Sequence, residues 1–105
     1  MYQLIFYVPV ENAEEVKTAL FQVGAGRIGN YDSCAWQSEG VGQFRPLDGS
    51  TPYLGQKNQI EFVRELKVEM VCSKDVLQKA IEALKKSHPY ETPAFSYFPI
   101  NQSPF

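Results

Sequence analysis

The sequence predicts an α+β protein with the ferredoxin-like order β-α-β-β-α-β, an antiparallel sheet carrying two helices on one face. Two kinds of hydrophobic periodicity support this fold class. Residues 60–72 alternate between mostly apolar and mostly charged side chains, which is typical of a strand with one buried face. Residues 11–23 and 74–87 instead repeat apolar residues every three to four positions, as amphipathic helices do. The length of 105 residues suits one domain, expected over residues 1–100, with a loose tail at 101–105.

The first half of the chain divides into a strand, a helix and a second strand. Residues 2–8 are rich in aromatic and branched side chains and stop before Pro9, which indicates a strand. The helix over 11–23 has acidic residues in its first turn and ends at Gly24. Residues 33–46 have an extended pattern, and the Gly-Val-Gly sequence inside them predicts a bulge or kink.

The second half contains the longest strand and the second helix. A connection over 47–57 is dense in turn-forming residues and leads to the strand that starts at Ile60. Ser73 is placed to cap the helix over 74–87, and residues 94–98 are expected to form a short last strand. Several aromatic side chains are expected in the core between sheet and helices, namely Tyr2, Phe6, Trp36, Phe44 and Phe62.

Residues 24–29, GAGRIG, match the glycine pattern of dinucleotide-binding sites, and Asp48 follows about twenty positions later. In such sites the glycines leave a strand and open a helix, whose N-terminus meets the pyrophosphate. Here they close a helix and lead into a strand, so a phosphate would face the negative end of the helix dipole. The sequence therefore favours a helix-ending turn with glycines at positive φ over a nucleotide site.

Composition and charge exclude several classes of function. The net charge of −2 gives no general attraction to nucleic acid or to an anionic membrane, so we expect neither as a partner. No apolar run approaches the roughly 18 residues that span a bilayer, and no secretion signal is visible, so the cytoplasm is the expected location. Cys34 and Cys72 stand apart, which indicates reduced thiols and neither a zinc site nor a disulfide framework.

Three separated motifs, GAGRIGNYDSCAW, EGVGQFRPLDGSTPYLG and HPYETPAF, resemble those of the PII/CutA-like domain inserted in YqfO-like proteins. These proteins are also called NGG1p-interacting-factor-like proteins or GTP cyclohydrolase I type-two homologues. The resemblance covers nearly the whole chain, from Met1 to Ile100. It implies the same ferredoxin-like fold, and it implies that such domains assemble as trimers through their sheet edges.

The resemblance also sets a limit on function. In the full-length family, two flanking halves of a larger domain supply a dinuclear metal site rich in histidine, aspartate and glutamate. This chain has one histidine, His88, and cannot rebuild a two-metal site of that kind by itself. We therefore expect no enzyme activity, no catalytic residue and no resident cofactor. The chain looks like the inserted domain on its own, and a larger metal-domain protein is one candidate partner.

The first candidate binding segment is Gly29-Asn30-Tyr31-Asp32, in the loop that enters the second strand. Its backbone, amide, phenol and carboxylate could all serve a ligand pocket. An Asx-type turn, in which Asn30 or Asp32 bonds to nearby backbone, explains the same composition. The family resemblance favours binding, and both interpretations stay open.

The second candidate segment, His88-Pro89-Tyr90-Glu91, follows the second helix directly. A protonated His88 could simply complement the helix C-terminus. As a catalytic base it would need a substrate proton within reach, and the sequence nominates none. A further alternative is a single divalent ion, weakly held between subunits by His88, Glu91 and Glu39.

Glu39 and Arg45, together with Thr51 and Tyr53, border the connection between the second and third strands. PII proteins carry their effector-sensing loop at this topological position, so the resemblance suggests a regulatory role. Arg45 could equally pair with a surface carboxylate, and the prolines of the connection equally suit a loop that packs between subunits.

The sequence thus predicts a small homo-oligomeric PII/CutA-like domain, by resemblance a trimer, that binds a ligand or regulates a partner. Long strands in so small a domain leave edges exposed, which independently favours assembly. The ligand, a small metabolite, an anion or a metal ion, is expected in clefts between subunits. The candidate site residues are Gly29, Asn30, Tyr31, Asp32, Glu39, Arg45, His88, Tyr90 and Glu91. Two alternatives stay open, a metal-assisted hydrolase component that acts with a partner chain and a purely structural oligomerisation module.

Overall fold

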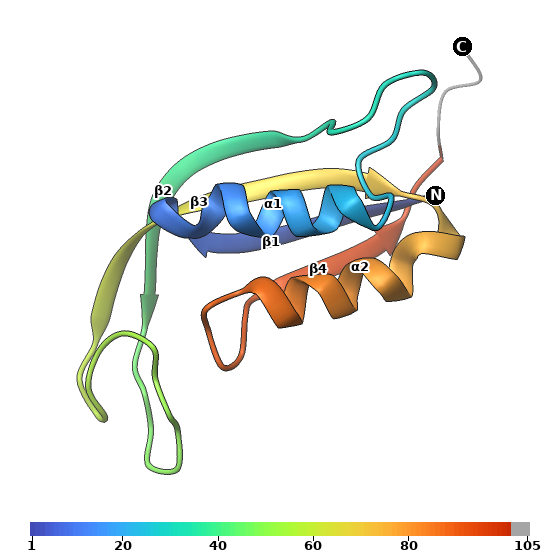
Figure 1. Cartoon of the computed structure of the whole chain (residues 1–105). Coiled ribbons are helices and arrows are strands. Elements are labelled where there is room, and N and C mark those ends of the chain that lie inside the picture. Colours follow the sequence, from blue (N-terminus) through green and yellow to red (C-terminus); the bar gives the residue numbers. More distant parts are fainter. Residues whose placement is uncertain (102–105) are drawn as a thin grey trace.

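The computed structural model describes residues 1–101 and has the predicted order of strands and helices (Figure 1). The elements are β1 (Tyr2–Pro9), the short 3-10 helix η1 (Val10–Asn12), α1 (Ala13–Gln22), β2 (Trp36–Phe44), β3 (Glu61–Cys72), α2 (Lys74–Ser87) and β4 (Phe95–Pro99). Each predicted element is present, with bounds shifted by at most a few residues. The loose tail predicted at 101–105 falls, beyond Asn101, outside the described residues.

The four strands form one antiparallel sheet in the order β2-β3-β1-β4, and both helices pack on one of its faces (Figure 1). This arrangement is the ferredoxin-like fold, so the predicted fold class is confirmed. Alternate strand residues point at the helices and exclude water there. The core contains Leu4, Phe6, Val8, Leu66, Val68, Met70 and Cys72 from the sheet, and Val16, Leu20, Ala80 and Leu84 from the helices.

The β2–β3 ribbon extends beyond the rest of the sheet and past the helices (Figure 1). The second part of β3 pairs with β1, whereas Glu61–Arg64 pair only with β2. Phe62, in this projecting part, is 63% exposed. Trp36 pairs with Glu69 on the face that the helices leave bare, and it is 70% exposed. The predicted core positions of Phe62 and Trp36 are therefore wrong, because no helix covers either side chain.

α1 ends in a Schellman motif, which explains the first glycine of GAGRIG. The Gly24 N–H donates to the Phe21 carbonyl at 3.0 Å, and the Ala25 N–H donates to the Leu20 carbonyl at 3.1 Å. All three glycines of the segment have positive φ, as predicted. The segment closes a helix and presents no helix N-terminus to a phosphate.

β2 keeps a continuous register with β3 from the pair Trp36–Glu69 to the pair Phe44–Glu61. The glycines at 40 and 42 therefore form no bulge, and β2 curves along its length without losing a ladder position (Figure 1). Ser33 has a φ of 56°, which keeps it out of the extended strand. Ser73 occupies the N-cap position of α2, but its side chain makes no capping hydrogen bond.

Both cysteines are free thiols, as expected from their isolation in the sequence. Cys72 is buried in β3, and Cys34 is half-buried in the loop before β2. No helix within residues 1–101 is long and apolar enough to cross a membrane.

Candidate functional site

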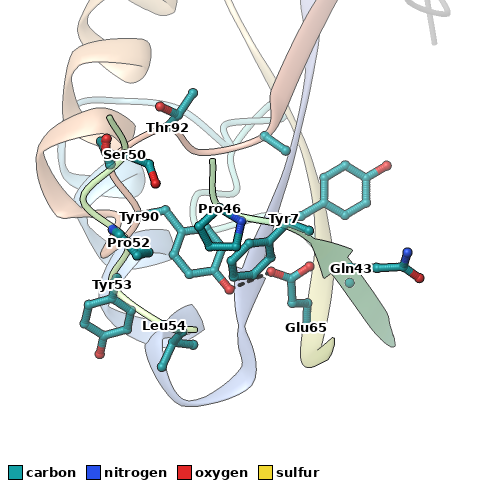
Figure 2. A pocket seen from close by; sticks show the side chains of 14 residues that line it. Tyr7, Gln43, Pro46, Ser50, Pro52, Tyr53, Leu54, Glu65, Tyr90 and Thr92 are labelled. Carbon is teal, nitrogen blue, oxygen red and sulfur yellow. Dashed lines mark hydrogen bonds between the residues drawn. The ribbon is translucent and has the colours of Figure 1, made fainter. Parts of the chain in front are cut away.

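A pocket of about 420 Å³ lies where the segment after β2 folds against the end of the sheet (Figure 2). Three parts of the chain form its walls: the end of β2 with the loop that follows it, the strands β1 and β3, and the loop between α2 and β4. The side chains that define its chemistry are Tyr7, Phe44, Tyr53, Glu65, Tyr90 and Glu91. The pocket thus joins the β2–β3 connection to the HPYE segment, both of which the sequence singled out.

Tyr90 is the central side chain of this pocket. Its hydroxyl donates a hydrogen bond to Glu65 Oε2 at 3.0 Å (Figure 2). The ring centres of Phe44 and Tyr53 lie 5.7 and 6.3 Å from that of Tyr90. Burial first, and then the hydrogen bond to Glu65 and its charge, raise the pKa of Tyr90 above the ordinary value. Tyr90 is therefore a neutral phenol that donates a proton to a hydrogen bond and does not act as a base.

Glu65 owes its position to a glycine on the neighbouring strand. Its side chain leans over Gly42, where a Cβ would collide with Oε1 of the carboxylate. At Gly40, which pairs with Glu65 in the ladder, a Cβ would meet open space. The missing side chain at Gly42 thus leaves room for a carboxylate in the wall of the pocket.

Replacing Gly42 with alanine is expected to push the Glu65 carboxylate aside and break its hydrogen bond with Tyr90. A partly exposed hydrogen bond to a charged group is worth about 1 kcal/mol, so Gly42→Ala should unfold more easily than Gly40→Ala by about that amount. Gly40→Ala is the matched control, because it makes the same exchange in the same strand. Chemical denaturation measures the difference, and equal stability of the two variants would contradict the role given to Gly42.

His88 lies beside Tyr90, is not among the residues that line the pocket, and is only 6% exposed. The Tyr90 N–H donates to Nδ1 at 3.1 Å, so the ring proton lies on Nε2, which donates to the Tyr7 carbonyl at 2.7 Å. Burial lowers the pKa of His88, although the Tyr7 bond and the Glu65 charge act in the opposite direction. The imidazole is thus neutral near pH 7, which differs from the protonated helix-end residue considered above.

Glu91 fixes the loop that covers the pocket. Its carboxylate accepts the Thr51 N–H through both oxygens, at 2.9 and 3.2 Å. Thr51 lies two residues before Tyr53, so this contact holds the Tyr53 ring near Tyr90. In the HPYE segment, His88 therefore fixes the chain to β1, Tyr90 lines the pocket, and Glu91 holds the loop after β2.

Two further candidate residues lie outside this pocket. Glu39 is exposed on β2 and is paired with Arg64 on β3 through a hydrogen bond and an ion pair. Arg45 is exposed just beyond β2 and is not among the lining residues. Within residues 1–101, no three His, Cys, Asp or Glu side chains are grouped to hold a metal ion.

The Gly29–Asp32 segment lies at the other end of the sheet. Ile28 and Tyr31 exchange two backbone hydrogen bonds of 2.9 and 3.0 Å, which close a tight turn. The segment is held near Val71, whose carbonyl accepts the Gly26 N–H at 2.8 Å. Val71 and Glu65 are six residues apart on β3, which corresponds to about 20 Å of extended strand. One chain therefore does not bring the two candidate segments into a single site.

Sequence analysis missed three residues that shape the pocket, namely Tyr7, Gly42 and Glu65. Glu65 belongs to the charged row of β3, where nothing in the sequence separates it from Lys67 or Glu69. A signal was present in β2, because a glycine in a strand often marks a close approach by another group. Locating that group needed the register of β2 against β3, which periodicity does not give.

The class of fold is clear from comparison with solved structures. The chain superimposes on CutA1 from Pyrococcus horikoshii with a TM-score of 0.70, over 98% of this chain and 86% of that one, at 20% identity. It also superimposes on a Bacillus cereus protein related to NIF3, with a TM-score of 0.82 and 38% identity. That match covers 96% of this chain but 26% of the other. The protein is therefore an α+β domain with the CutA-like fold.

Sequence comparison identifies the relatives more closely. The chain is 46% identical over 102 residues to the GTP cyclohydrolase 1 type 2 homolog of Bacillus subtilis, covering 97% of this chain and 27% of the relative. It is 41% identical over 100 residues to the protein of the same name from Mycobacterium tuberculosis, covering 95% and 26%. No protein-family profile matches the chain. The resemblance predicted from the three motifs is confirmed, and the chain spans about a quarter of the length of these relatives.

Proposed function

We propose that this chain is a PII/CutA-like module that binds a small molecule and plays a regulatory part, not a catalytic one. The observation that carries the proposal is the pocket around Tyr90, an aromatic hollow with a few fixed polar groups. Small-molecule sites usually have this composition, apolar walls with a few oriented polar atoms. A phenol, a carboxylate and a loop held by Glu91 converge on it.

The module acts as a homo-oligomer, which we propose to be a trimer. β2 is one of the two edge strands of the sheet, and nearly all of its residues are exposed. Trp36 and Val41 are each 70% exposed on this strand. Exposed edge strands with apolar side chains are sites of strand pairing between chains. A second copy of the same chain is the partner for this edge, and the cytoplasm remains the expected location.

Assembly also offers a way to unite the separated candidate segments. Within one chain, the Gly29–Asp32 turn and the Tyr90 pocket lie at opposite ends of the sheet. In an oligomer, the turn of one copy can approach the pocket, Glu39 or Arg45 of the next, so the ligand lies in a cleft between subunits. The name of the relatives carries no activity across, because the chain spans only about a quarter of their length.

Native mass spectrometry of the purified chain tests both parts of the proposal. We expect a trimer that retains a reproducible non-protein mass or acquires one from a panel of nucleotides, amines and divalent metal ions. Glu91→Ala, which frees the loop over the pocket, is expected to lower ligand retention without changing the number of subunits. A bare monomer that takes up nothing would contradict the proposal. A trimer that takes up nothing would favour a purely structural module.

A further inference from the structure

We infer that the Tyr90 pocket receives a small organic cation, an alkylammonium ion, between the rings of Phe44, Tyr53 and Tyr90 and the carboxylate of Glu65. The inference rests on the proposed binding function and specifies the chemical class of the ligand. It follows from the negative charge of the pocket, from the arrangement of its aromatic rings and from the hydrogen bonds that its two carboxylates make.

The charged side chains that line the pocket are both carboxylates, Glu65 and Glu91. The two oxygens of Glu91 share one donor, the Thr51 N–H, which ties this carboxylate to the loop. Glu65 is occupied on one side only: Oε2 accepts the Tyr90 hydroxyl, whereas no hydrogen bond to Oε1 is found within residues 1–101. Oε1 of Glu65 is therefore an anionic atom that a ligand can meet.

The aromatic rings of the pocket are the second feature that favours a cation. The planes of Phe44 and Tyr53 are tilted at 59° and 51° to that of Tyr90, so the rings are not stacked flat, and all three line the pocket. The face of an aromatic ring is electron-rich and attracts a cation placed within about 6 Å of its centre. Several such faces around a carboxylate bind ammonium groups that carry alkyl substituents, because the substituents cover apolar surface while the charge stays paired.

The electrostatic environment of Tyr90 agrees with this assignment. Burial and the adjacent Glu65 raise the pKa of the phenol, which means that an added negative charge is unfavourable at this position. Burial disfavours a charge of either sign, whereas the negative charge of Glu65, which contributes to the same rise in pKa, favours a positive charge. An anionic ligand would have to approach Glu65 without a cation to compensate it. A hard divalent ion would lack the six or more oxygen ligands that it prefers.

The test is an NMR titration of the 105-residue chain with three probes: choline, its neutral carbon isostere 3,3-dimethylbutan-1-ol, and propionate. We expect choline to shift the resonances of Tyr53 and Tyr90 and to bind at least ~10-fold more tightly than the isostere. Glu65→Gln is expected to weaken choline at least ~10-fold and to leave the isostere unchanged. Tyr53→Ala, at a side chain 55% exposed on a surface loop, should weaken choline about threefold to tenfold without loss of folding.

Two controls and three outcomes make the test decisive. Glu82→Gln on α2 removes a carboxylate far from the pocket, and Tyr97→Ala removes an exposed ring on β4, so neither is expected to change choline binding. Preferential binding of choline that depends on Glu65 and Tyr53 supports the inference. Equal binding of the isostere, or tighter binding of propionate, overturns the cation assignment and leaves a small-molecule pocket. No shift at Tyr53 or Tyr90 with any probe overturns both the cation assignment and the binding function proposed for this pocket.

Discussion

Replacing His88 with alanine is expected to lower the free energy of unfolding by about 3 kcal/mol. The substitution deletes two hydrogen bonds at once, one to the Tyr7 carbonyl and one from the Tyr90 N–H. Leaving a buried donor or acceptor without a partner costs about 1–3 kcal/mol for each group. The variant also removes the ring that packs against Tyr90 at a centre-to-centre distance of 5.0 Å. Chemical denaturation followed by circular dichroism measures the loss.

His88→Asn provides the matched comparison, because the asparagine oxygen can still accept the Tyr90 N–H while the bond to Tyr7 is lost. Its destabilisation should be about half that of His88→Ala. Lys86→Ala, at an exposed position of α2, should change stability by less than about 0.5 kcal/mol. If His88→Ala were as stable as Lys86→Ala, the histidine would not anchor the segment.

His88 also makes the free energy of unfolding depend on pH, and the direction of this dependence follows from the burial of its ring. The pKa of His88 is lower in the folded protein than the ordinary 6.5, so the unfolded chain binds a proton that the folded chain does not. This contribution to stability is complete above about pH 6.5 and is lost as the pH falls through the lower folded value. We expect the wild-type protein to lose more stability than His88→Asn between pH 7.5 and pH 5.5. Parallel pH profiles of the two proteins would show that the buried ring does not titrate differently on folding.

The fold was predictable because its signals are local. The alternating residues of β3 show a half-buried strand, and the three-to-four repeat of Val76, Leu77, Ala80 and Leu84 shows an amphipathic helix. Gly24 marks the end of α1 by its chemistry alone, since a left-handed residue is needed there. None of these features depends on what lies on another element, so each could be taken from a short stretch of sequence.

The site was less predictable because its contacts join distant parts of the chain. The motif HPYE drew attention to Tyr90, but the sequence did not show that its partner would be Glu65 on β3. Nor did it show that His88 is used by backbone groups and that Glu91 holds Thr51 forty residues away. The exposure of Trp36 was missed for a similar reason, since whether a strand residue faces helices or solvent depends on register.

Changing both Trp36 and Val41 to lysine is expected to dissociate the proposed oligomer, raising its dissociation constant at least ~100-fold. Both side chains are 70% exposed on the edge strand β2, five positions apart and therefore on opposite faces of the sheet, and a copy that pairs with this edge would cover part of each. Burial of a large apolar side chain contributes about 1.5–3 kcal/mol, and each 1.4 kcal/mol corresponds to about a factor of ten. Lysine on an edge strand also opposes strand pairing directly, because its charge would have to lose its hydration.

Sedimentation velocity over a range of protein concentrations measures this effect, with circular dichroism to show that the fold is retained. Leu47→Lys is the matched control, because Leu47 is also an exposed apolar residue, at 55%, but lies in the loop beyond β2. It should sediment as the wild-type protein does, whereas the Trp36→Lys, Val41→Lys protein should sediment as a monomer. A double variant that keeps the wild-type sedimentation coefficient would place the interface elsewhere on the chain, and a monomeric wild-type protein would remove the basis for a site between subunits.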